Sequence, residues 1–251
     1  MKISIDTKAL LNDGFRMPVA AFGLCCENAG GKQAVLHALA SGYRHIDLVS
    51  GTDLQQVKEA LEECGIPREE LFITVKVKAE SVRSDLMTSL ENLGTEYADL
   101  CLLSMAAEGS ADAYKEIEKL IEEKYVHSAG VCGFDVTELN SLLSRVNLIP
   151  AVNQIECVPE LLKNELILFC RQNKVGVQAR LCLKSRQKQM EKIGRLYGKT
   201  GAQVMLKWLL ERRIAVVSEA ADDEEITQNI ELFDFDLSTE DHSMINIIYR
   251  Y

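Results

Sequence analysis

The feature that most constrains this chain is a regular alternation of short apolar runs with amphipathic helical stretches, from about residue 18 to the end. This alternation is typical of repeated strand–helix units that build a parallel sheet. Eight runs have the length expected of buried strands. They occupy residues 18–24, 43–49, 71–77, 99–104, 127–133, 150–156, 175–181 and 213–219.

Helical patterns separate these runs, and several of them end at a glycine. They occupy residues 31–41, 53–65, 81–94, 111–124, 136–146, 159–173 and 202–213, and residues 183–192 enter a further helix. Eight strands with intervening helices predict closure into a (β/α)8 barrel, and 251 residues is near the usual size of that fold. No Ser/Gly/Pro-rich stretch or charge block marks a linker, so we expect one domain over residues 1–251.

Additions to the barrel are predicted at both ends of the chain. Residues 3–18 contain Asp13-Gly14 between two short alternating runs, which predicts a hairpin that plugs the bottom of the barrel. Near the other end, residues 222–233 and 238–251 begin with acidic or hydroxyl capping residues, which predicts two extra helices.

Composition excludes several classes of partner. The formal net charge is −10, whereas a nucleic-acid-binding protein needs a basic face. No apolar run is long enough to span a bilayer, and the start lacks the apolar region of a signal peptide. We therefore expect a soluble cytoplasmic protein with neither a nucleic-acid nor a membrane partner. The eight cysteines lack paired CxxC spacing, which favours reduced thiols.

Several stretches resemble the aldo-keto reductases, in particular the branch of prostaglandin F synthases and diketo-gluconate reductases. They read LNDGFRMP, AVLHALASGYRHID, GIPREELFITVK, AVNQIE, ELILFC, YGKTGAQVMLKWLLER and NIELFDFDLSTED, and they span almost the whole chain. The resemblance rests on their order and spacing together. It implies a nicotinamide cofactor, NAD(P)H, lying across the C-terminal ends of the strands.

The resemblance also implies a four-residue catalytic site: an aspartate, a tyrosine that donates a proton, a lysine that tunes this tyrosine, and a histidine that orients the carbonyl. The aspartate matches Asp47 at the end of the second strand run, and the lysine matches Lys76 at the end of the third. The histidine position holds Ser104. Two of the four residues therefore have a match.

The tyrosine has no match. It should lie about five residues after Asp47, where this chain reads LVSGTD and is one residue short. Neither Tyr43 nor Tyr97 aligns without breaking the matches around it. A positioned general acid contributes about 10²–10⁴ in rate, and losing a second donor to the oxygen costs on the order of 3 kcal/mol more. Ser50, Thr52 and Ser104 offer hydroxyls for a ligand, but none is acidic enough to replace that tyrosine.

The cofactor positions implied by the resemblance have changed as well. Glu219 and Glu225 stand where the family grips the adenosine 2′-phosphate with a lysine and an arginine. One unit-charge pair at about 4 Å is worth roughly 4 kcal/mol at an effective dielectric near 20. Replacing attraction by repulsion at both positions predicts poor NADPH binding, whereas NADH lacks this phosphate and is tolerated better.

The nicotinamide end has changed in the same way. Arg180 replaces the aromatic residue that should stack on the ring, and Cys132-Gly133 replaces a Ser-Asn pair. Asn153 and Gln154, which would contact the carboxamide, and Asn229, which would lie near the adenine, remain. No cofactor is therefore expected from the residues themselves, and NAD(P)H follows from the family resemblance alone.

Two interpretations of these residues stay open. Asp47 and Lys76 are either remnants of the active site or an ordinary buried ion pair. Cys25, Cys26, Cys132, Cys157 and Cys182 fall near the strand C-termini, where thiolates bind zinc or do redox chemistry if Arg180 lowers a thiol pKa. Their spacing matches no known metal pattern, so no metal site is predicted.

The predicted function follows from the altered site rather than from the fold. The first hypothesis is a pseudoenzyme that serves as a binding or regulatory scaffold for an unknown small molecule or protein. The alternative is an enzyme: a weak NADH-preferring reductase of aldehydes or ketones, or a thiol- or metal-based activity at the barrel mouth. Whether the chain is an enzyme is left open at this point.

Overall fold

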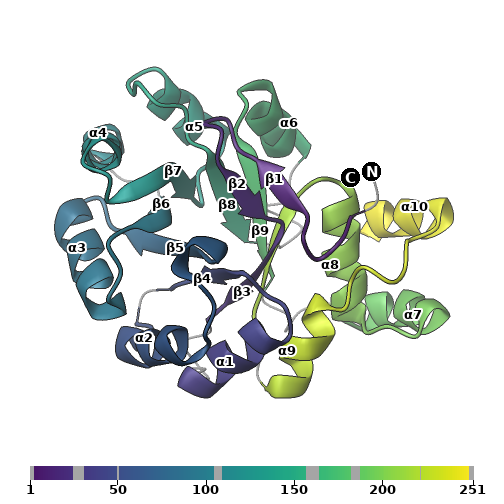
Figure 1. Ribbon diagram of the computed structural model, residues 1–251. Helices are drawn as coiled ribbons and strands as arrows, with labels where there is room; N and C mark the ends of the chain where they lie inside the picture. Colours follow the sequence, from purple (N-terminus) through teal and green to yellow (C-terminus); the bar gives the residue numbers. More distant parts are fainter. Residues whose placement is uncertain are drawn as a thin grey trace.

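Eight parallel strands close into a barrel in the computed structural model (Figure 1). The structure describes residues 3–24, 31–49, 51–104, 109–156, 164–181, 187–220 and 222–248. Each strand pairs with the next along the chain, and the last strand pairs with the first. The strands are β3 (Ala20–Gly23), β4 (His45–Asp47), β5 (Phe72–Val77), β6 (Ala98–Ser104), β7 (Val126–Cys132), β8 (Val152–Glu156), β9 (Gly176–Leu181) and β10 (Ala215–Ser218). The predicted (β/α)8 barrel and its eight strands are confirmed.

The helices surround the barrel (Figure 1). They are α1 (Lys32–Ala40), α2 (Leu54–Glu63), α3 (Val82–Leu93), α4 (Ser110–Glu122), α5 (Val136–Leu143), α6 (Asn164–Gln172), α7 (Gln187–Tyr197), α8 (Gly201–Glu211), α9 (Asp223–Ile230) and α10 (Thr239–Ile248). The predicted helix 159–173 appears as α6, and its first residues fall in the segment 157–163 outside the described residues. Within the described part of the chain, no helix combines the length and apolar character needed to cross a bilayer.

Local capping explains where several of these helices begin. The side chains of Asp53, Thr200 and Asp222 each accept a hydrogen bond from the backbone N–H three residues later, at the starts of α2, α8 and α9. Ser238 does the same for the N–H of Asp241 in α10, at 3.1 Å. These contacts satisfy donors that have no partner within the helix, and they confirm the two extra helices predicted near the C-terminus.

The N-terminal hairpin closes one end of the barrel. Its strands β1 (Lys8–Leu10) and β2 (Arg16–Pro18) pair antiparallel, and Gly14 adopts a positive φ of 95° in the turn between them. The hairpin crosses the centre of the strand ring in Figure 1. Residues of the hairpin segment, of the barrel strands and of the position just before β8 form one buried apolar cluster: Leu11, Met17, Phe72, Leu100, Leu102, Ala151, Val152 and Ala215. The predicted hairpin is confirmed.

This plug provides a direct test of the interior packing. Replacing Met17, which is 2% exposed, by alanine is expected to lower the free energy of unfolding by at least about 2 kcal/mol, because the removed atoms leave a cavity. Leu10 lies in the same hairpin but is 66% exposed, so Leu10→Ala is expected to change stability by less than about 0.5 kcal/mol. Urea unfolding of both variants measures the difference. Equal losses would contradict the role assigned to Met17.

The main apolar core lies between the outer face of the barrel and the helices. Ile46 and Val75 of the strands and Leu86 and Trp208 of the helices are each at most 2% exposed and belong to it. Because successive strand residues point to opposite faces, the alternate positions are left to line the barrel interior. These interior positions carry the polar residues of the candidate site.

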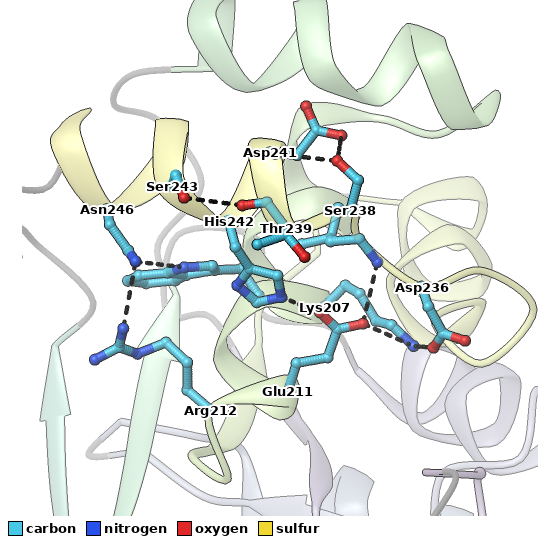
Figure 2. A network of polar contacts seen from close by, with 12 residues as sticks. Lys207, Glu211, Arg212, Asp236, Ser238, Thr239, Asp241, His242, Ser243 and Asn246 are labelled. Carbon is cyan, nitrogen blue, oxygen red and sulfur yellow. Dashed lines mark hydrogen bonds and ion pairs between the residues drawn. The ribbon is translucent and has the colours of Figure 1, made fainter.

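A polar network joins the C-terminal segment to α8 (Figure 2). Lys207 bonds Asp236 at 2.9 Å, and His242 Nε2 lies 2.5 Å from Glu211 Oε2. Trp208 Nε1 donates to Asn246 Oδ1 at 3.2 Å. These contacts hold α10 against the barrel's helical layer, away from the C-terminal ends of the strands.

Candidate functional site

The C-terminal ends of the barrel strands bring charged and polar side chains into one layer, here called the mouth. Asp47 ends β4, Lys76 is the penultimate residue of β5, and Cys132 ends β7. Arg180 is the penultimate residue of β9, and Glu219 directly follows β10. In parallel barrels this end of the sheet is where the chemistry is placed.

Asp47 and Lys76 form a buried ion pair in the mouth. Lys76 Nζ donates to Asp47 Oδ1 at 2.5 Å, and the two side chains are 7% and 0% exposed, respectively. β4 and β5 are neighbours in the barrel, so the pair joins adjacent strands. The sequence predicted both residues at this position, and the structure brings them into direct contact.

Two glutamines extend this ion pair across the barrel. Gln154 Nε2 donates to Asp47 Oδ2 at 2.6 Å and to Gln178 Oε1 at 2.8 Å. Gln178 is fully buried, and its own amide nitrogen lies 3.9 Å from Met17 Sδ. An amide nitrogen carries two hydrogens, so these two bonds use both donors of Gln154. If Gln154 donated to the carboxamide of a ligand, it would have to break its bond to Asp47 or to Gln178.

Sequence reasoning did not single out Gln178. Its signal is positional, since it lies two residues before Arg180 on β9 and so faces the same side of the sheet. A polar residue at an inward position of an otherwise apolar strand indicates a buried hydrogen bond.

A second ion pair joins β9 to the end of β10. Arg180 Nε donates to Glu219 Oε1 at 2.5 Å, and Arg180 Nη2 contacts the same oxygen. The side chains are 26% and 11% exposed. Burial opposes the charged guanidinium, but the charges of Glu219 and Asp47 outweigh it and raise the pKa of Arg180. Two positions that the sequence reading predicted to differ from the family pattern are therefore bonded to each other.

Cys132 is a poor candidate for thiolate chemistry. Burial raises its pKa, and the nearby charges of Lys76 and Arg180 oppose this effect without reversing it. Its Sγ lies 3.8 Å from Gln154 Oε1. The charge of Arg180 therefore does lower the pKa of this thiol, as expected, but desolvation outweighs it and the net pKa of Cys132 is raised.

The other cysteines of the thiol hypothesis are Cys25, Cys26, Cys157 and Cys182, and they lie outside the described residues. In the part of the chain that the structure covers, no group of three His, Cys, Asp or Glu side chains is arranged to hold a metal ion. The described residues therefore offer no set of metal ligands for the thiol or metal alternative.

Asn153 and Asn229, the two remaining asparagines of the cofactor hypothesis, also bond within the protein. Asn153 Nδ2 donates to the carbonyl of Phe134 at 2.8 Å, and its buried Oδ1 has no hydrogen-bond partner among the described residues. Asn229 Nδ2 donates to the carbonyl of Glu219 at 3.1 Å. Asn153 is therefore directed toward the helical layer, and Asn229 holds the end of β10.

Glu225 lies in the first turn of α9, where its backbone N–H donates to the capping carboxylate of Asp222 at 2.9 Å. Asp223 and Glu224 share this turn. Four acidic residues therefore stand together at this helix start. Their negative charge is stabilised there by the helix dipole, which explains why the sequence tolerates the cluster.

Two hydroxyl residues of the predicted site are described. Ser104 ends β6 beside Cys132 of β7, at the edge of the mouth. Thr52 Oγ1 donates to the carbonyl of Val49 at 2.8 Å, so this hydroxyl stabilises its own loop. Ser50 lies outside the described residues.

Each of the five described tyrosines is engaged away from Lys76. The Tyr43 hydroxyl bonds the Ser218 hydroxyl within the core, where burial raises the pKa of Tyr43. The Tyr114 hydroxyl donates to the carbonyl of Ala129. The Tyr197 hydroxyl donates to the carboxylate of Asp241. Tyr97 stacks on His127. Tyr97 directly precedes β6 and Tyr125 directly precedes β7, so both lie at the end of the barrel opposite the mouth. Among the described residues, then, no phenol meets the Lys76 ammonium.

Comparison with known proteins identifies the origin of this arrangement. A sequence model of the aldo/keto reductase family matches residues 29–186 and 182–250. The chain belongs to the aldo/keto reductase family. The resemblance stated from the sequence is confirmed, and the Asp47–Lys76 pair occupies the mouth of an aldo/keto reductase barrel.

The relatives extend over nearly the whole chain. An uncharacterized oxidoreductase, YtbE, of Bacillus subtilis is 31% identical over 99% of this chain and 95% of its own. The crystal structure of an aldo-keto reductase from a deep-sea metagenome library superposes with a TM-score of 0.90 at 33% identity, covering 96% of this chain and 94% of that one. A Bombyx mori aldo-keto reductase solved in complex with NADP superposes with a TM-score of 0.86 at 26% identity, covering 98% and 93%.

The described residues of this mouth lack contacts that the family pattern implies for NADPH. Carboxylates stand at Glu219 and Glu225, where the family pattern has cations for the 2′-phosphate. Arg180, which stands where the family pattern has an aromatic ring, is bonded to Glu219. Both amide hydrogens of Gln154 are used within the protein. We therefore assign no reaction step to NADPH in this barrel.

Proposed function

We propose that this aldo/keto reductase barrel does not carry out NADPH-dependent carbonyl reduction and that it serves as a binding or regulatory scaffold for a small molecule or a protein. One observation carries the proposal. The Lys76 ammonium is bonded to Asp47, and no tyrosine of the described chain lies beside it. Reduction of a carbonyl leaves an oxygen that must receive a proton, and among the described residues of the mouth no phenol is placed to donate it.

The remaining donors do not compensate for the missing tyrosine. Ser104 replaces the histidine of the family pattern, and a serine hydroxyl is far less acidic than a phenol placed beside a lysine. With the general acid and one oxygen donor both gone, turnover is expected to fall by at least about 10³-fold relative to a reductase that retains them.

Thermal unfolding with excess NADPH, with NADH and without nucleotide tests the proposal. A ligand at 100 times its Kd stabilises the folded state by about 2.7 kcal/mol, which would raise the unfolding midpoint visibly. We expect no rise with NADPH. A small aldehyde and either nucleotide should show no measurable turnover next to a reductase that retains the tyrosine. A midpoint raised by NADPH together with brisk turnover would overturn the proposal.

A second candidate function is a weak NADH-preferring reductase. It is favoured by the retained Asp47–Lys76 pair and by the name oxidoreductase given to the Bacillus subtilis relative. A rise in the unfolding midpoint with NADH alone, accompanied by slow aldehyde reduction, would support this candidate and exclude the scaffold. Metal analysis and thiol labelling of the purified protein test the remaining thiol or metal activity.

The proposed setting is the cytoplasm, without a nucleic-acid or membrane partner. A net charge of −10 repels polyphosphate and anionic lipid surfaces alike. Retention on a heparin or anionic-vesicle column at physiological salt would contradict it.

A further inference from the structure

A second cavity lies in the helical layer of the barrel, between α4 and α5. Its volume is about 650 Å³, which is within the range of sites that bind small molecules. α1 and α2 pack closely against each other, and so do α3 and α4, whereas α4 and α5 stand apart (Figure 1). We call this cavity the α4–α5 groove, and its polar walls contain Asp112, Lys115, Thr137, Glu138, Ser141 and Arg145.

Two buried apolar side chains form the floor of the α4–α5 groove. Phe134, which lies between β7 and α5, is 1% exposed, and Leu142 of α5 is 2% exposed. Both line the groove and both belong to the main apolar core. The floor is therefore fixed by the packing of the barrel, and it offers an apolar surface to a hydrocarbon chain.

The wall formed by α5 carries polar side chains that the protein itself does not use. Thr137, Ser141 and Arg145 follow one another at steps of four residues, so they lie along one side of the helix. All three are exposed and line the groove. None of these side chains makes a hydrogen bond or an ion pair with another described residue. They are available to a ligand.

Opposite charges stand at the two ends of this wall. Glu138 Oε2 accepts from the backbone N–H of Asp135 at 2.7 Å, and Oε1 has no partner among the described residues. Seven residues separate Glu138 from Arg145, which places them on nearly the same side of the helix, about 10 Å apart along its axis. On the facing wall, Lys115 and Asp112 contact each other at 3.5 Å, so their charges largely cancel.

We propose that the α4–α5 groove binds an elongated small zwitterion of the ω-amino-acid class. Glu138 receives its ammonium group, and Arg145 receives its carboxylate. The hydrocarbon chain between the two charges lies over Phe134 and Leu142. A simple anion would meet the charge of Glu138 and the net charge of −10, and a simple cation would meet the charge of Arg145. This site lies outside the mouth and is independent of the function proposed there.

The first test compares three probes: 6-aminohexanoate, hexanoate and hexylamine. 6-Aminohexanoate carries an ammonium and a carboxylate at opposite ends of a short hydrocarbon chain, and each of the others carries one charge only. Binding is followed by NMR titration of the backbone amides of the labelled protein. We expect 6-aminohexanoate to bind with a dissociation constant on the order of millimolar and to shift the amides of α4 and α5. The other two should bind at least about threefold more weakly, and added salt should weaken the zwitterion.

The second test removes one charge at a time. Glu138→Gln keeps the capping hydrogen bond, because glutamine serves in a capping box as glutamate does, and Arg145 is exposed, so both variants should fold. Each is expected to weaken 6-aminohexanoate binding at least about threefold. Glu240→Gln in the first turn of α10 and Arg195→Gln in the last turn of α7 are the matched controls. They remove the same charges from exposed helix ends away from the groove, and they should bind as wild type does.

Several outcomes would overturn the inference. Hexanoate or hexylamine binding as tightly as 6-aminohexanoate would show that the groove does not select a zwitterion. Amide shifts confined to other elements would place the ligand elsewhere. Equal losses in the control variants would show that only the overall charge matters. Nucleotide binding or aldehyde reduction at the mouth bears on the proposed function alone.

Discussion

Replacing Asp47 by leucine is expected to lower the free energy of unfolding by about 3–5 kcal/mol, because the Lys76 ammonium would then be buried without its counter-charge. Lys76 is 7% exposed and donates to Asp47 at 2.5 Å, so water cannot take over the role of the carboxylate without opening the mouth. Gln154 would lose an acceptor as well and would keep only Gln178. Urea unfolding monitored by circular dichroism measures the loss.

The double variant Asp47→Leu/Lys76→Met distinguishes a pair kept for structure from one kept for chemistry. Removing both charges leaves an apolar pair of similar size, so most of the stability should return. Asp112→Leu serves as the surface control, because its carboxylate is 88% exposed and its contact with Lys115 is 3.5 Å, and the expected loss is about 1 kcal/mol or less. If the single variant Asp47→Leu were as stable as wild type, Asp47 would not stabilise the buried Lys76 ammonium, and the prediction would be wrong.

The second large effect is a loss of stability in mild acid, caused by His45. This side chain is fully buried in the barrel, with Nε2 2.8 Å from Thr74 Oγ1 and its ring edge-on to Phe72. Burial lowers its pKa to about 4, and the opposing charge of Asp47 does not restore it. The folded protein therefore holds His45 neutral at pH values where the unfolded chain protonates it.

The direction of the pH effect follows from this lowered pKa. The unfolded pKa is about 6.5, so above that pH neither state binds the proton and the stability is fully present. As the pH falls from about 6.5 to about 4, His45 becomes protonated in the unfolded state but stays neutral in the folded state. The free energy of unfolding therefore falls by roughly 3 kcal/mol. Below about pH 4 both states carry the proton, and this contribution stays constant.

His45→Gln isolates this contribution from that of the carboxylates, since glutamine keeps a hydrogen-bonding side chain but does not titrate. The free energy of unfolding, measured at several pH values between 4 and 7, should fall less steeply in His45→Gln than in wild type. Equal slopes for the two proteins would show that His45 is not the group responsible.

The barrel could be predicted from the sequence because its signals are local. Apolar runs of strand length, amphipathic stretches between them and the Asp13-Gly14 turn each depend on neighbouring residues only. Some elements are shorter in the structure than the sequence predicted. The run 18–24, for example, contributes only Ala20–Gly23 as β3, since Pro18 belongs to the hairpin strand β2. The caps at Asp222 and Ser238 were likewise readable from single residues and their spacing.

The candidate site could be predicted only as a set of positions. Matching the family pattern predicted that Asp47, Lys76, Arg180 and Glu219 lie at strand ends. It did not indicate that Arg180 bonds Glu219. Nor did it indicate that Gln154 donates its two amide hydrogens to Asp47 and Gln178. It also gave no sign that Asn153 donates to the carbonyl of Phe134, between β7 and α5.

The order of strands and helices and the capping residues are therefore determined by the sequence alone, because each depends on residue identity and short spacing. The pairing of charges in the mouth was decided only by the tertiary structure. Barrel closure sets which strand ends face one another, and it brings together side chains that are 29 residues apart for Asp47–Lys76 and 39 apart for Arg180–Glu219. Burial at that point then decides which of the polar groups bond to each other and which are left for a ligand.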